Sequence, residues 1–221
     1  MREIELADGV STVTDRLTAV SPQPPIWLVL ATAAIALVAV GYRPLWRLLR
    51  TGVTIAHETG HAVVAVCTGR TLSGIRLHSD TSGVTVSRGR SRGFGMVLTT
   101  LAGYPAPSLV GLGFAALLAS GWEGLMLGIL ILALVAVILV IRNLFGFLAV
   151  LVAGAAAVAV YWYGNAVWRG VFGYVVTWFL LFGGMRAVVE LWQVWARGDG
   201  SDADQLAWLT RLPARLWVLV F

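Results

Sequence analysis

Residues 51–68 read TGVTIAHETGHAVVAVCT, and this stretch decides both the fold class and the chemistry. Most of its residues are small or apolar, and its length approaches the roughly 20 residues that a helix needs to cross a bilayer. His57, Glu58 and His61 stand within it. Ionisable side chains at membrane depth are costly to bury, so a cluster of three indicates a functional site.

The spacing of the two histidines predicts a metal site. Residues four apart lie on one face of a helix, so His57 and His61 can present both imidazoles to one zinc ion. Zinc hydrolases use three protein ligands and keep the fourth position for a water whose pKa falls to about 7. Glu58, on the adjacent face, would take a proton from that water and pass it to a leaving amine. The motif therefore predicts zinc as cofactor and Glu58 as the catalytic acid and base.

The composition extends the membrane interpretation to the whole chain. Of 221 residues, 58% are hydrophobic and only 12% are charged, which is more apolar surface than a soluble domain could bury. The basic residues are all arginine and stand mainly between apolar runs, so they indicate membrane topology and no nucleic-acid partner. Cys67 is the single cysteine, which excludes a disulfide within the chain.

The apolar runs predict an all-α polytopic membrane protein with about six transmembrane helices. Residues 1–25 form a polar tail that lacks the pattern of a cleavable signal peptide, and residues 26–221 form one integral membrane domain. GYPAP at residues 103–107 should kink its span. Residues 205–221 are expected as an interfacial helix or half-span. The six expected spans are residues 26–40, 51–68, 94–118, 124–141, 144–163 and 171–195.

Residues 70–92 depart from the helical pattern. Two short runs, residues 71–78 and 83–88, alternate β-branched and other side chains around a polar turn, which predicts a small β-hairpin. Its edge could pair with an unwound substrate segment, or the hairpin could be an ordinary connection. Its arginines, counted against the opposite loops, favour a cytoplasmic hairpin and a cytoplasmic N-terminus. A polar loop is expected at residues 197–204.

A third metal ligand has to come from a short inventory of acids. Ser201 can cap a following helix, with Asp204 completing a capping box three residues later, which leaves Asp202 free to bind metal. Asp199 is the runner-up, and all three acids of this loop could instead simply favour a helix N-terminus. His78, at the end of a hairpin strand, is expected as an interfacial polar residue. The acids outside the tail and the motif are Asp80, Glu123, Glu190, Asp199, Asp202 and Asp204.

Several short segments carry a family resemblance. They are HETGHA at 57–62, the hairpin that begins at Gly69-Arg70, LAGY at 101–104, Arg142-Asn143 and Ser201-Asp202-Ala203. Over about residues 50–217, they resemble the site-2 protease family, and most closely its compact bacterial branch. The first segment is the specific one. The resemblance implies an intramembrane zinc endopeptidase in which His57, His61 and Asp202 bind zinc and Glu58 is catalytic.

The same resemblance implies the partners and the location. Family members cleave membrane-anchored proteins, often anti-sigma factors or similar regulators, and a multi-pass place in the bacterial cytoplasmic membrane follows. Many carry an Asn-Pro near an Asp-Gly on a later span, and that compact motif is missing here. Asn143 could contact the substrate in its place, although a polar turn between two helices is the simpler role.

Two other function classes stay open from the sequence. One is a catalytically inert zinc-binding membrane scaffold, and the other is a transporter-like protein. Glu58 argues for the enzyme, because ligands alone bind metal but transfer protons poorly. No internal repeat pairs the two halves of the chain, which argues against a transporter.

Overall fold

The computed structural model describes residues 11–194 and 200–221. Residues 11–18 are helical, and the hairpin is made of β1 (Thr71–Leu77) and β2 (Gly83–Arg88). The predicted helical fold with one small hairpin is therefore confirmed. The labelled helices are α2 (Ile26–Gly41), α3 (Arg43–Leu49), α4 (Thr51–Cys67), α5 (Phe94–Leu101), α6 (Pro105–Ala119), α7 (Glu123–Val140), α8 (Leu144–Tyr163), α9 (Ala166–Val194), α10 (Asp202–Thr210) and α11 (Ala214–Val220).

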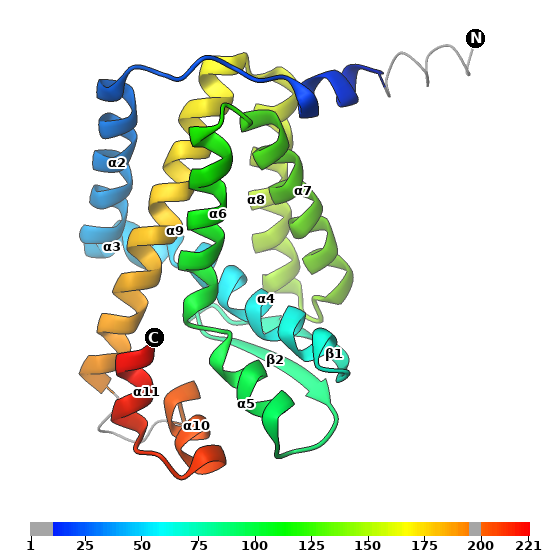
Figure 1. Ribbon diagram of the computed structural model, residues 1–221, viewed down its shortest axis with the longest axis vertical. Helices are drawn as coiled ribbons and strands as arrows, with labels where there is room; N and C mark the ends of the chain where they lie inside the picture. The colour runs from blue at the N-terminus through cyan, green and yellow to red at the C-terminus, as the bar shows by residue number, and fades with distance from the viewer. Residues whose placement is uncertain (1–10, 195–199) are drawn as a thin grey trace.

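The described residues contain three helices that are long and apolar enough to cross a membrane, namely α7, α8 and α9. The bent pairs α2–α3 and α5–α6 raise the number to five if each pair is one span. In Figure 1, α2, α6, α7, α8 and α9 run roughly parallel, whereas α4 lies obliquely across one end of this bundle. The predicted count of about six spans is not confirmed, because the motif helix has only 17 residues and does not follow the bundle axis.

Proline and a left-handed arginine set two of the breaks between helices. The bend between α5 and α6 measures 66°, and α6 begins at Pro105, which lacks the N–H that a continuous helix would use. The predicted kink at residues 103–107 is thus confirmed. The segment predicted as one interfacial element folds as α10 and α11, because Arg211 is left-handed, with φ 63°, and Pro213 precedes α11.

One edge of the hairpin is bonded to a neighbouring segment. β1 and β2 pair antiparallel, with Thr71 opposite Arg88 and Leu77 opposite Gly83. The outer edge of β1 is held by the α7–α8 connection, where the Asn143 amide donates to Leu77 O at 2.6 Å and accepts from Leu77 N at 3.1 Å. In the described chain the sheet has two strands, so the outer edge of β2 carries no further strand.

The N-terminal tail is fixed to the opposite end of the bundle from the hairpin. The Ser21 hydroxyl donates to Glu123, the buried first residue of α7, whereas the hairpin bonds Asn143, just past the end of α7. Because α7 is long and apolar enough to cross a membrane, the tail and the hairpin are bonded near opposite ends of one candidate span. The side of the membrane on which the tail and the hairpin lie therefore stays a prediction.

Candidate metal centre

His61 is held in one tautomer by the helix that follows the hairpin. Its Nδ1 lies 2.7 Å from the carbonyl oxygen of Thr99 on α5. A carbonyl oxygen only accepts hydrogen bonds, so Nδ1 carries the proton and Nε2 of the neutral ring keeps its lone pair. That Nε2 lies 3.1 Å from Nε2 of His57, one turn earlier on α4. The two rings therefore present nitrogen atoms to one point.

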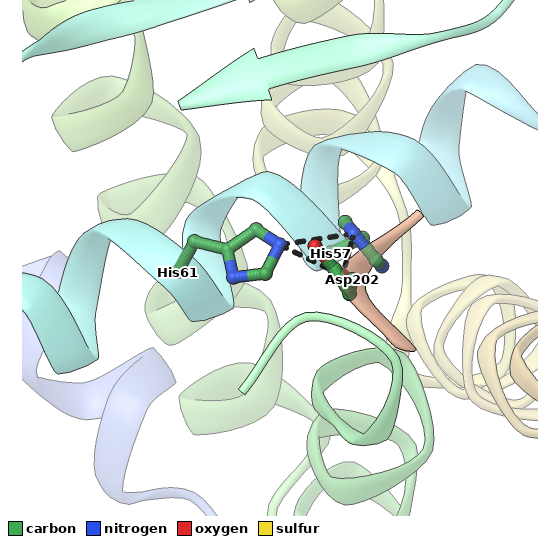
Figure 2. Close-up of side chains that lie close together, drawn as sticks. All are labelled: His57, His61 and Asp202. Carbon is green, nitrogen blue, oxygen red and sulfur yellow. Dashed lines mark hydrogen bonds and ion pairs between the residues drawn. The ribbon is translucent and has the colours of Figure 1, made fainter. Parts of the chain in front are cut away.

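Asp202 reaches the same point from the start of α10. Its Oδ2 lies 3.2 Å from Nε2 of His57 and 3.2 Å from Nε2 of His61, and Figure 2 shows the three side chains converging. The predicted capping box is present, because the Ser201 side chain accepts from the Asp204 backbone and the Asp204 carboxylate accepts from the Ser201 backbone. This cap leaves Asp202 free. Asp199, the runner-up, lies outside the described residues.

The other described acids of the inventory are engaged elsewhere. Asp80 accepts hydrogen bonds from the hydroxyl and the backbone N–H of Ser82, and these bonds hold the pKa of its carboxyl below the ordinary value. Glu190 accepts from Trp46 Nε1 at 2.7 Å and pairs with Arg186 at 3.0 Å. Within the described residues, one group of His, Cys and acidic side chains could hold a metal ion, and it is His57, His61 and Asp202.

The donor atoms fit a zinc ion on geometric and chemical grounds. On a tetrahedron around zinc with bonds of about 2.0 Å, ligand atoms lie about 3.3 Å apart, close to the three observed distances. Oδ2 of Asp202 is buried, and no described group donates a hydrogen bond to it. One proton cannot satisfy three mutual contacts between two nitrogens and a carboxylate oxygen, whereas a cation between them satisfies all three. The residues present therefore fit the metal that the motif predicts.

Glu58 lies beside this group and faces the hairpin. Its side chain is buried, at 4% exposure, and lines a cavity of about 610 Å³ together with the metal-binding group. The Thr85 hydroxyl of β2 donates to Glu58 Oε2 at 2.6 Å. The sequence did not predict this contact, because the alternation that predicts a strand does not indicate which helix packs against that strand.

Comparison with known families is consistent with this geometry. A family model described as Peptidase M50B-like matches residues 29–221. The chain belongs to this family. It is the site-2 protease family of membrane metalloproteases, so the predicted resemblance is confirmed at the family level, and the M50B-like chain is a membrane protein. Comparisons with curated proteins and with solved structures gave no match.

Gly103 lies against the candidate metal-binding group. A Cβ at this position would lie 2.4 Å from His61 Nε2 and 2.6 Å from His57 Cε1. Only glycine lets the α5–α6 turn come so close to both rings. Gly60, on the motif helix, allows α4 and α6 to pack closely, since a Cβ there would lie 2.5 Å from Ala106 Cβ. The sequence predicted a kink at Gly103, but the contact of Gly103 with the two rings follows only from the fold.

Gly103→Ala should lower the zinc content of the purified M50B-like protein. The added methyl would push the two imidazoles apart, and overpacking of this kind costs about 1–3 kcal/mol, or roughly 5- to 150-fold in affinity. Zinc per chain and affinity by chelator competition measure the effect. Gly113→Ala is the matched control, because a Cβ there meets nothing within 4 Å. Equal zinc affinity in the two variants would contradict the steric role.

Two predicted residues lie away from the metal-binding group. His78 is exposed in the hairpin turn, where its Nδ1 lies 3.2 Å from the Ser82 hydroxyl. Asn143 sits at the outer edge of β1 with its amide engaged by Leu77. Neither lines the cavity that contains Glu58.

Proposed function

We propose that the protein is an intramembrane zinc endopeptidase that hydrolyses peptide bonds of membrane-anchored proteins. The observation that carries this proposal is the triangle of His57, His61 and Asp202 beside Glu58, on the wall of one cavity. Two nitrogens and one carboxylate oxygen make up a catalytic donor set, which leaves a fourth position open. A catalytically inert zinc-binding scaffold would need the three ligands but not Glu58, the carboxylate that follows His57.

Each residue has a distinct part in hydrolysis. When bound, zinc would act as a Lewis acid and lower the pKa of a coordinated water molecule to about 7. His57, His61 and Asp202 hold the ion, and the Thr99 carbonyl fixes the orientation of the His61 ring. Glu58 accepts a proton at its carboxylate from the attacking water and delivers it to the leaving amine nitrogen.

The backbone pattern of the hairpin supports a docking role for β2. Ile75 O accepts a hydrogen bond from Arg142 N, and the N–H and C=O groups of Leu77 both bond the Asn143 side chain. The backbone groups of these two residues of β1 therefore point away from β2. In an antiparallel pair of strands, the backbone N–H and C=O groups of the residues opposite them then also point away from the partner strand. Those residues are Thr85 and Gly83. Their N–H and C=O groups therefore face the free edge, beside the cavity.

An extended substrate segment would pair with this edge. Strand addition supplies hydrogen bonds from the main chain, which suits a protease that must unwind a helix to reach its peptide bonds. We assign Asn143 an indirect part in substrate binding, as the clamp on the far edge of the hairpin. Anti-sigma factors and similar membrane-anchored regulators of the bacterial cytoplasmic membrane are the substrate class that we propose.

The test uses purified protein in lipid vesicles with two single-span model proteins. One carries a helix-breaking Gly-Pro in its transmembrane segment, and the other carries leucine throughout. We expect about one zinc per chain and cleavage within the membrane segment of the first substrate at a higher rate. Chelation should stop cleavage and added zinc should restore it. Protein that holds no zinc, or that cuts neither substrate, would refute the proposed function.

A further inference from the structure

The Glu58 carboxylate is bound by the hairpin. The Thr85 Oγ1 lies 2.6 Å from Glu58 Oε2 and 3.0 Å from the Glu58 backbone oxygen. The first distance is in the range of a charge-assisted O–H···O⁻ bond, the stronger class of hydrogen bond. One carboxylate oxygen is thereby fixed, and no described residue donates a hydrogen bond to Oε1.

The strand is shaped around this carboxylate at a second position. A Cβ on Gly83 would lie 2.6 Å from both Glu58 Cγ and Glu58 Oε1. Gly83 and Thr85 are two apart on β2, so they belong to the same face of the strand. One leaves room for the carboxylate, and the other donates a hydrogen bond to it. Val84 between them is exposed on the opposite face.

Thr85 therefore has two separate sets of polar groups, a side-chain hydroxyl and a backbone N–H and C=O, that face different partners. Its hydroxyl binds Glu58, while its backbone N–H and C=O face the free edge of β2, where the proposed substrate strand would pair. A strand bonded to that backbone would immobilise Thr85, and through the hydroxyl it would also immobilise the carboxylate of Glu58. An acid placed on α4 alone would have no such link to the bound peptide.

We propose that Thr85 is a positioning residue that ties Glu58 to the strand edge where substrate docks. The hydrogen bond orients the carboxylate for proton transfer, so docking and orientation of the proton acceptor depend on one residue. This inference rests on the proposed function, since it assigns the partner that positions Glu58 in that reaction.

The first experiment compares Thr85→Val with Thr85→Ser in the vesicle assay. Valine keeps the shape and the β-branched character but loses the hydroxyl, so kcat should fall about 10- to 100-fold, the loss typical of a hydrogen bond to a charged group. KM and zinc content should stay unchanged. Serine keeps the hydroxyl and should retain most of the wild-type kcat. Thr71→Val, at an exposed position of β1, is the matched control and should have no effect.

A second readout does not depend on activity. The carboxylate stretching band of Glu58 is assigned in zinc-free protein from the infrared difference between wild type and Glu58→Gln. Thr85→Val should shift this band, and Thr85→Ser should leave it in place. A band that does not move, or a kcat of Thr85→Val equal to or above that of the wild type, overturns the positioning role. Wild-type protein that cuts nothing while the band does shift overturns the proposed function instead.

Discussion

Glu58→Gln should lower the rate of cleavage by at least about 10²-fold and leave zinc in place. Glutamine has nearly the same shape, and it can still accept the Thr85 hydrogen bond through its amide oxygen, but it cannot take a proton from water. Loss of the general acid and base costs about 10²- to 10⁴-fold in rate. The measurements are the rate of cleavage of the model substrate that carries Gly-Pro in its transmembrane segment, and the zinc content of the same preparation.

Glu123→Gln is the control for this substitution. Glu123 is also buried, at 5% exposure, but it lies at the far end of α7, bonded to Ser21. The same chemical change there should leave cleavage near the wild-type rate. If Glu58→Gln cut as fast as this control, the assignment of Glu58 as proton carrier would be wrong.

Asp202→Ala should lose the metal and, with it, the activity. The carboxylate is the single anion among the three donors, and without it two imidazoles remain, fewer than the three protein ligands of a catalytic zinc site. Loss of an outer-shell partner alone lowers metal affinity about 10- to 100-fold, so loss of a ligand should exceed that. Zinc per chain after dialysis measures the outcome.

Asp204→Ala and Asp199→Ala complete the comparison. Asp204 is the capping partner of Ser201, so its loss should lower the stability of α10 and keep the zinc. Asp199→Ala should change neither property. A protein that keeps its zinc without Asp202 and loses it without Asp199 would transfer the ligand role to the runner-up.

Local signals carried much of the prediction. The four-residue spacing of His57 and His61 depends only on the helix repeat, the hairpin follows from alternation and a polar turn, and the kink follows from Pro105. The capping box is likewise a four-residue pattern, and it explains why Asp202 could be separated from Asp204 before any fold was known.

Contacts between distant segments were beyond the sequence pattern. The Thr99 carbonyl on His61 and the Thr85 hydroxyl on Glu58 depend on how α5 and β2 dock against α4, and no periodicity encodes that docking. The number of spans failed for a related reason. Hydropathy measures whether a segment tolerates lipid, whereas the oblique course of α4 results from its packing against α5, α6 and the hairpin.

The capping box at Ser201 has a consequence for biosynthesis. Chain synthesis delivers the two histidines on α4 long before it delivers the aspartate at the start of α10. Until that helix has formed and docked, the proposed donor set lacks its carboxylate, and the proposed protease could not yet attack the membrane proteins around it. On this proposal, proteolytic activity arises as one of the last events of folding, when the polar start of α10 docks against the two histidines of α4.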